Sequence, residues 1–166
     1  MNCIMLKLKI MSSKNKFEKD LEQGNNGEKI IMMYLFCQGM KFVSFNDDYR
    51  YDIKMHSEKR NEEVLFEIKT DVYAKDTGNI AIEIRYKGKP SGISHTEADW
   101  FIYWYRDIPF NNVWMIKVKD LKSLIKKSNF KIVNGGDDNQ SQLVLIPRKK
   151  YKEYFKVDTI KTKKLL

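Results

Sequence analysis

Three segments in the first half of the chain alternate between apolar and polar residues, and this pattern constrains the fold most. Residues 49–55, 64–69 and 79–87 each place apolar side chains at every second position. Because successive side chains of a strand point to opposite faces, the spacing predicts three half-buried strands. Only short polar connections separate the three segments, so we expect consecutive strands of an antiparallel meander.

Helical spacing precedes these strands. Ile31, Tyr34 and Leu35 recur as they would on one face of a helix, which predicts a helix over residues 28–38. Helical character extends back to about residue 14, but the Gly-Asn-Asn-Gly stretch that ends at Gly27 is expected to interrupt it. Gly39 follows as a stop signal.

The second half predicts further strands and helices. The expected elements are an aromatic strand at 99–106, a strand at 113–118, a helix from Asp120 to about 127, a strand at 143–146 and a helix at 148–155. The whole indicates an α/β fold with a mixed central sheet flanked by helices. We expect one domain over residues 1–166, with a core at about 14–147 and a basic C-terminal helix and tail at 148–166.

Net charge gives the first indication of function. The chain carries a formal charge of +9 and a pI near 9.4, which favours association with polyanions such as nucleic acid. The alternative is that the many lysines reflect the composition of the genome. The C-terminal tail holds eight Lys or Arg residues, among them Arg148, Lys149 and Lys150, which either grip a DNA backbone or form a solvated surface.

Membrane and secreted classes are disfavoured. No apolar run reaches the roughly 18 residues that a membrane span needs. The two cysteines, Cys3 and Cys37, form neither a disulfide framework nor a metal motif. A cytoplasmic setting is therefore expected.

Asp52, Glu67 and Lys69 carry the candidate chemistry. If the first two strands are neighbours, the two carboxylates approach each other on one face, and Lys69 lies two positions further along. Paired carboxylates repel unless a cation lies between them, and Mg²⁺ prefers carboxylate and carbonyl oxygens, so the Ile68 carbonyl is a further candidate ligand. Lys69 could orient the nucleophile or neutralise developing charge. The alternative is an ordinary solvated strand face.

Other residues near this centre are also candidates. If the third strand pairs with the second, Glu83 faces the same side as Glu67 and could bind a second metal; an exposed or paired glutamate is the alternative. The Gly-flanked loop after this strand offers phosphate contacts, unless it is an ordinary turn. Its candidate contacts are Lys87, Lys89 and Ser91, and Thr96 further along the chain is another.

These residues resemble the PD-(D/E)XK nuclease superfamily. The resemblance rests on Asp52, a spacer of 14 residues, and then Glu67-Ile68-Lys69, which follows the apolar start of a strand. Tyr51 stands where the pattern often has proline. The stretch from Thr77 to Trp100 is similar to small phage-type members. The resemblance covers residues 28–124 approximately.

The resemblance implies an activity and a set of roles. A restriction-endonuclease-like fold would hydrolyse DNA phosphodiester bonds with a water activated by Mg²⁺, or by Mn²⁺ in its place. Asp52 and Glu67 would bind the metal, Lys69 would position the nucleophile, and Glu28 matches the first-helix glutamate that reaches the metal in Holliday-junction-resolvase-like members. Glu28 could equally be a solvated residue of the first helical turn.

The resemblance also bears on assembly and setting. A junction or branched substrate would need two sites and therefore favours a homodimer. The phage-type likeness is compatible with the cytoplasm of a phage-infected cell. The rival hypotheses are a DNA-binding module with a degenerate site, and an interaction protein without catalysis.

Overall fold

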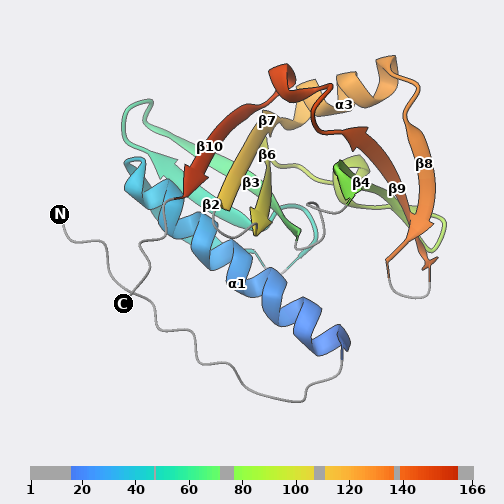
Figure 1. Cartoon of the computed structure of the whole chain (residues 1–166). Helices are drawn as coiled ribbons and strands as arrows, with labels where there is room; N and C mark the ends of the chain where they lie inside the picture. Colours follow the sequence, from blue (N-terminus) through green and yellow to red (C-terminus); the bar gives the residue numbers. More distant parts are fainter. Residues whose placement is uncertain (1–15, 47, 72–76, 107–110, 137–138, 161–166) are drawn as a thin grey trace, which may run out of the picture.

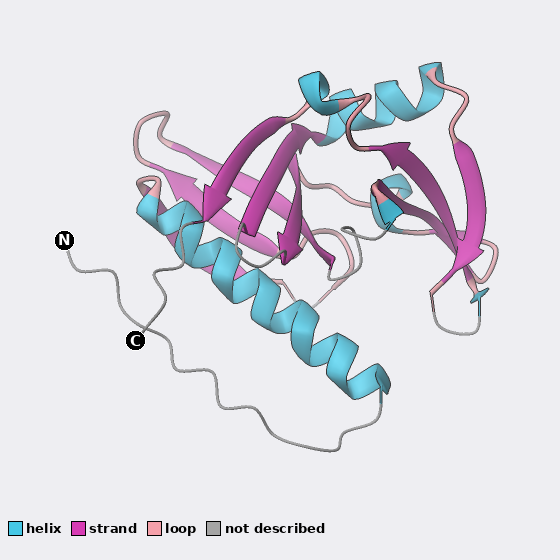
Figure 2. Ribbon diagram, in the orientation of Figure 1, coloured by secondary structure: helices cyan, strands magenta, loops and turns pink. Residues whose placement is uncertain are grey.

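The computed structural model describes residues 16–46, 48–71, 77–106, 111–136 and 139–160. These residues form a mixed α/β fold with two β-sheets and two α-helices (Figures 1 and 2). The predicted fold class, with a mixed central sheet flanked by helices, is confirmed. A second sheet is the main addition to it.

The larger sheet has six strands in the order β1-β2-β3-β6-β7-β10. They are β1 (Met40–Phe45), β2 (Ile53–Ser57), β3 (Glu62–Asp71), β6 (Trp100–Arg106), β7 (Asn111–Lys117) and β10 (Lys156–Ile160). Strands β3 and β6 are parallel, and every other neighbouring pair is antiparallel. The predicted antiparallel pairing of the first two alternating segments, β2 and β3, is therefore confirmed.

The third alternating segment forms a strand in a different sheet. The smaller sheet has the order β5-β4-β9-β8. Its strands are β5 (Lys89–Pro90), β4 (Asn79–Tyr86), β9 (Ser141–Pro147) and β8 (Lys131–Gly135). The expected meander of three consecutive strands is thus wrong, because β4 pairs with β5 and β9 while β3 pairs with β2 and β6.

Burial of two apolar faces explains the division into two sheets. One face of the six-stranded sheet packs against α1 (Lys16–Cys37), which contributes Ile31 and Leu35 to that core. The opposite face packs against the smaller sheet and α3 (Val118–Lys127), which contribute Ile82 and Leu121. A strand β4 placed beside β3 would leave this second face without its cover. Figure 1 shows the helix α1 and the smaller sheet on opposite sides of the larger sheet.

Helix α1 runs without a break through the Gly-Asn-Asn-Gly stretch that was expected to interrupt it. Gly27 is buried where the helix meets β3, and a Cβ atom added there would overlap the Thr70 hydroxyl oxygen and lie 3.1 Å from Thr70 Cβ. Close packing of helix on sheet therefore explains this glycine. Gly39 follows the helix with φ of 87°, as a stop signal requires.

The C-terminal segment differs from its prediction. The expected helix at 148–155 is absent from the described residues, which instead hold a turn, a 3-10 helix at Lys152–Tyr154 and strand β10. Strand β10 pairs with β7 and is thus part of the larger sheet, not a tail outside the core. Helix α3 starts two residues before Asp120, with Lys117 as its N-cap residue.

Strands β1 and β8 were not predicted. Prediction of a strand relied on a regular alternation of buried and exposed positions. Neither strand has this alternation, and both are largely exposed. Within the described residues, neither helix is long and apolar enough to cross a bilayer.

Candidate active site

The acidic centre lies where β2 begins beside β3. The register places Ile53 opposite Phe66, so the next pair along would be Asp52 and Glu67. The Asp52 amide donates to the Phe66 carbonyl at 2.9 Å, and the Ile68 amide donates to Asp52 Oδ2 at 2.5 Å. The Asp52 carboxylate is therefore fixed against the backbone of β3 at Ile68, the residue after Glu67.

The geometry of β3 also places the Ile68 carbonyl. In a strand, the N–H and the C=O of one residue point toward the same neighbour. Because the Ile68 N–H faces Asp52, the Ile68 carbonyl lies on the Asp52 side of β3 as well. The arrangement agrees with the predicted position of this oxygen; its role as a metal ligand stays a prediction.

Glu67 is oriented by a residue from the segment before β6. Thr96 Oγ1 lies 2.8 Å from Glu67 Oε2 and 2.8 Å from the Arg50 carbonyl oxygen, and the Ala98 amide donates to it at 3.2 Å. Thr96 is only 4% exposed. The sequence suggested Thr96 as a DNA contact; the structure instead buries its hydroxyl within the site.

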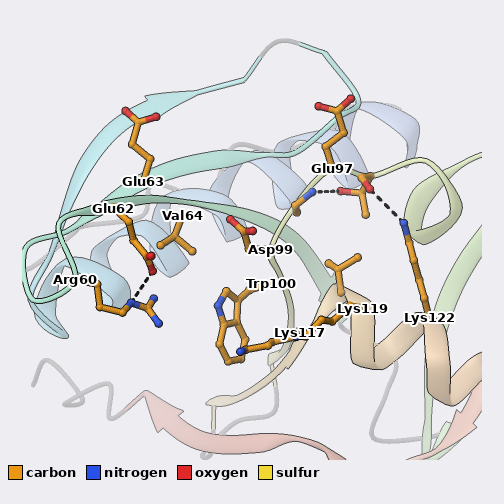
Figure 3. Close-up of a pocket in the computed structure, with 13 residues that line it drawn as sticks. Arg60, Glu62, Glu63, Val64, Glu97, Asp99, Trp100, Lys117, Lys119 and Lys122 are labelled. Carbon is orange, nitrogen blue, oxygen red and sulfur yellow. Dashed lines mark hydrogen bonds and ion pairs between the residues drawn. The ribbon is translucent and has the colours of Figure 1, made fainter.

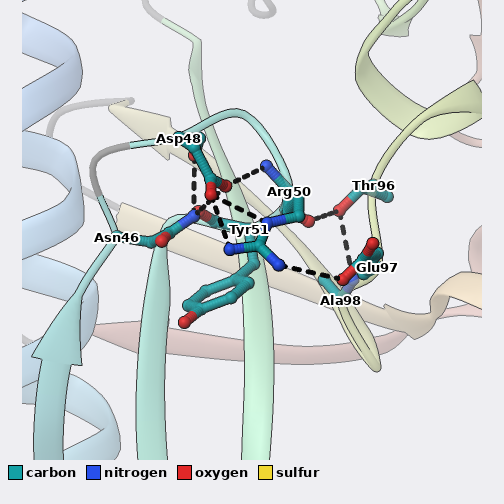
Figure 4. A network of polar contacts seen from close by, with 7 residues as sticks. All are labelled: Asn46, Asp48, Arg50, Tyr51, Thr96, Glu97 and Ala98. Atoms are coloured by element: carbon teal, nitrogen blue, oxygen red, sulfur yellow. Dashed lines mark hydrogen bonds and ion pairs between the residues drawn. The ribbon is translucent and has the colours of Figure 1, made fainter.

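The surroundings of Thr96 join two loops (Figure 4). Arg50 forms ion pairs with Asp48 at 2.6 Å and with Glu97 at 3.9 Å. Asn46 Nδ2 donates to the Asp48 side chain and to the Tyr51 carbonyl, at 2.6 and 3.0 Å. This network holds the loop that leads into Asp52. Sequence reasoning missed its link to Thr96 because Thr96 and Arg50 lie 46 residues apart.

Three carboxyl groups influence one another at this centre. Burial raises the pKa of Glu67 to about 7, and the charges of Asp52 and Glu28 add to that rise. Burial and the Asp52 charge likewise raise the pKa of Glu28 to about 7. Burial raises the pKa of Asp52 to about 6, against the opposing effects of the Ile68 hydrogen bond and Lys69. Glu28 therefore belongs to the same electrostatic cluster as the two strand carboxylates.

Lys69 supplies positive charge beside this cluster. Its ammonium group lowers the pKa of both Asp52 and Glu67. It lies two positions beyond Glu67 on β3 and points to the same face of the strand. The side chain is exposed, so the ammonium is accessible to a bound phosphate.

The donor set is suited to a hard cation, although its side chains are not drawn together around one point. In the described part of the chain, no group of three or more His, Cys, Asp or Glu residues stands in an arrangement that would hold a metal ion directly. The chemistry of the set still fits one: Glu28, Asp52 and Glu67 are partly buried carboxyls that disfavour one another's charge, and a divalent ion would relieve this.

Glu83 lies elsewhere and has a different environment. Ser91 Oγ donates to Glu83 Oε1 at 2.6 Å, and Ser141 Oγ donates to Glu83 Oε2 at 2.5 Å. The expected approach of Glu83 to Glu67 depended on a β3–β4 pairing that does not occur. Glu83 therefore serves the smaller sheet, and the Ser91 hydroxyl is engaged there instead of facing a phosphate.

The predicted DNA-binding cations occupy two places. Lys87 and Lys89 are exposed at the turn between β4 and β5, where the Lys87 ammonium lies 5.2 Å from the centre of the Tyr86 ring. The guanidinium of Arg148 lies 4.6 Å from the Tyr105 ring centre and is half-buried, whereas Lys149 and Lys150 are exposed. Lysines 87, 89, 149 and 150 remain available to a polyanion.

A cleft of about 450 Å³ adjoins Thr96 (Figure 3). Trp100 lies in it, with the Lys117 ammonium 5.7 Å from its ring. Arg60 and Glu62 form an ion pair at its rim, 2.7 Å between Nε and Oε1. Of the aromatic residues in β6, Trp100 is partly exposed, while Phe101, Tyr103, Trp104 and Tyr105 lie in the core.

Comparison with known proteins gives one distant likeness. The solved structure of the bacterial homing endonuclease I-Ssp6803I is similar over 76% of this chain and 77% of that chain, with a TM-score of 0.47 and 12% identity. No family model and no curated protein matches the chain. Membership of the PD-(D/E)XK superfamily stays a prediction.

Proposed function

We propose that the chain is a divalent-metal-dependent nuclease that hydrolyses phosphodiester bonds of DNA. The observation that carries this proposal is the cluster of Glu28, Asp52 and Glu67, with Lys69 beside it. Burial raises the pKa of all three carboxyls, and neighbouring carboxylate charge adds to the rise for Glu28 and Glu67. Three carboxyls buried together without a cation would lower the stability of the fold. A metal-binding site, in contrast, requires carboxylates that lie together.

The ligands of the proposed ion come from three segments. Asp52 and Glu67 would hold Mg²⁺, or Mn²⁺ in its place, and the Ile68 carbonyl would add a neutral oxygen. Glu28 would assist from α1. Bound there, the ion would activate a water for attack and stabilise negative charge on the phosphate.

Lys69 would act on the substrate directly. Its ammonium would donate to a non-bridging phosphate oxygen or to the attacking water, and so stabilise charge that grows in the transition state. Once the ion is bound, the Ile68 amide would hold Asp52 and the Thr96 hydroxyl would hold Glu67 during the reaction. Preorganised groups are the ones that contribute most to such catalysis.

The charge of the chain supports DNA as substrate. The formal charge of +9 favours a polyanion, and the exposed Lys87, Lys89, Lys149 and Lys150 would meet its phosphates. A junction or branched DNA cut on two strands would need two sites, which a homodimer would supply. Both the branched substrate and the homodimer are part of the proposal.

The test compares wild type with Glu67→Ala and Lys69→Ala on linear duplex, nicked, flapped, four-way and single-stranded DNA, with Mg²⁺ and with EDTA. We expect Mg²⁺-dependent cleavage by wild type, and retained DNA binding without cleavage by both variants. Unchanged cleavage in either variant would refute the mechanism. Salt-sensitive binding without any cleavage by wild type would instead indicate a DNA-binding module, and absence of DNA binding an interaction protein.

A further inference from the structure

Thr96 connects the candidate active site to the second layer of the protein. Its amide donates to the Gly92 carbonyl at 2.9 Å, and its carbonyl accepts from Lys122 Nζ of α3 at 3.4 Å. Gly92, at φ of 51°, lies against β4, where an added Cβ atom would be 2.6 Å from the Glu83 carbonyl oxygen. The Thr96 backbone is therefore fixed by α3 and by a segment packed on the smaller sheet.

The hydrogen bonds of its side chain point to Glu67 as the group that needs the hydroxyl. A threonine hydroxyl has one hydrogen to donate and can accept two hydrogen bonds. It accepts from the Ala98 amide, and two oxygens lie at 2.8 Å, on Arg50 and Glu67. The Arg50 carbonyl already receives the Glu97 amide at 2.8 Å. The hydroxyl hydrogen can thus serve Glu67 without leaving Arg50 unsatisfied.

A single fixed oxygen is enough to orient a glutamate carboxylate. Glu67 projects from the middle of β3 on a side chain with several rotatable bonds, and the contact at Oε2 selects one orientation among them. The residue that does this is itself buried and held on both sides, so the orientation does not depend on a mobile partner.

We propose that Thr96 is a positioning residue, whose hydroxyl orients the Glu67 carboxylate for a divalent cation shared with Asp52. This inference rests on the proposed function. Outer hydrogen bonds to metal ligands commonly change metal affinity by about 10- to 100-fold when they are removed. The smaller sheet and α3 would then contribute to the site through Thr96, without a ligand of their own.

The closing experiment measures Mn²⁺ binding to the full chain, stripped of metal, by titration calorimetry. Thr96→Val keeps the shape and removes the hydroxyl, and Thr96→Ser keeps the hydroxyl. We expect the valine variant to bind Mn²⁺ at least about 10-fold more weakly, and the serine variant within about 3-fold of wild type. Thr96→Ala replaces the valine variant if circular dichroism shows that valine is not tolerated.

Ser141→Ala is the matched control, because it removes an equivalent hydroxyl contact from Glu83. In wild type, Ser141 Oγ donates to Glu83 Oε2 at 2.5 Å. It should leave Mn²⁺ affinity unchanged. Wild-type affinity in Thr96→Val, or equal losses in the valine and serine variants, would overturn the inference. Mn²⁺ binding by wild type without DNA cleavage would overturn the proposed function alone, and absence of Mn²⁺ binding would overturn both.

Discussion

Glu67 in β3 and Glu83 in β4 are both half-buried glutamates near the middle of a strand, yet their environments differ. Glu83 receives a serine hydroxyl on each of its carboxylate oxygens. Glu67 receives one threonine hydroxyl, and burial together with the charges of Asp52 and Glu28 raises its pKa.

The difference separates a structural carboxylate from a candidate catalytic one. Buried polar groups are normally hydrogen-bonded, and Glu83 follows that rule through Ser91 and Ser141. The surroundings of Glu67 oppose its charge unless a cation is added. Alternating strand patterns alone cannot distinguish these two cases, because the two residues occupy equivalent positions in the pattern.

The largest expected effect is that of Glu67→Gln, and Glu83→Gln is its matched control. Glu67→Gln should lower DNA cleavage at least about 100-fold, since a neutral amide is a poor ligand for Mg²⁺ and loses the transition-state stabilisation. Glu83→Gln should cut at nearly the wild-type rate, because its carboxylate contacts the hydroxyls of Ser91 and Ser141 and lies outside the acidic cluster. Initial rates at saturating Mg²⁺ measure both, and equal losses in the two variants would remove the distinction.

Substitution of two glycines tests the packing of α1 on the larger sheet and the packing of the Gly92 segment on the smaller sheet. Gly27→Ala should destabilise the protein by about 1–3 kcal/mol, because the new methyl overlaps the side chain of Thr70. Thr70→Ala should relieve this loss in the double variant, since it removes the overlapping hydroxyl. Urea unfolding of the single and double variants measures the effect.

Gly92→Ala should cost a similar amount without such relief. Its obstacle is the Glu83 backbone carbonyl, and its φ of 51° disfavours any other residue. Recovery of stability in Gly92→Ala by Glu83→Ala would contradict this account.

The stability of the metal-free protein should fall as pH rises. The folded-state pKa values of Glu28, Asp52 and Glu67 are raised to about 7, 6 and 7, so the folded protein binds more protons than the unfolded chain above pH 4. The contribution of the protonated carboxyls to folding stability is fully present below their pKa values in the unfolded chain. It is lost as the three groups ionise in the folded protein, when the pH rises through about 7. Thermal melts in EDTA across this range measure it.

Added Mg²⁺ should reverse that loss, and its effect on Tm should grow with pH because the ion binds the ionised carboxylates. Glu67→Gln should weaken both the pH dependence and the Mg²⁺ effect, while Glu83→Gln should leave them intact. A Tm response to Mg²⁺ that is independent of pH would argue against a carboxylate site.

The smallest effects should come from the exposed lysines. Replacing Lys149 and Lys150 by alanine, or Lys87 and Lys89, should weaken DNA binding modestly and evenly across sequences. Each lost phosphate contact should reduce the slope of log affinity against log salt by about 0.9. Binding isotherms at several salt concentrations would show which pair, near β9 or on the β4–β5 turn, lies on the DNA path.

Local patterns predicted most strands but only one of the strand pairings. The alternation in β2 and β3 also predicted their antiparallel pairing, because only a short turn connects them. The neighbour of β3 on its other side is β6, whose pairing joins Phe66 to Trp100, far apart in sequence. Such a choice depends on covering two apolar faces at once, and no single segment contains that information.

Two segments show how packing overrides local preference. The glycines before residue 28 lower helix propensity, but Gly27 permits a close contact with Thr70 that the helix needs. Residues 148–155 suggested a helix after Pro147, yet the open edge of β7 accepts β10 and draws the chain into the sheet. Both corrections arise from contacts across the fold.

The sequence by itself determined the α/β class, the positive charge, and the placement of Glu67 and Lys69 on one face of β3. The period of two along a strand is a property of the backbone, so this placement needed no tertiary information. The tertiary structure decided that Glu28 belongs to the acidic cluster, that Glu83 does not, and that Thr96 orients Glu67. Those outcomes depend on which elements pack together, and packing is settled only when the whole chain buries its apolar surfaces.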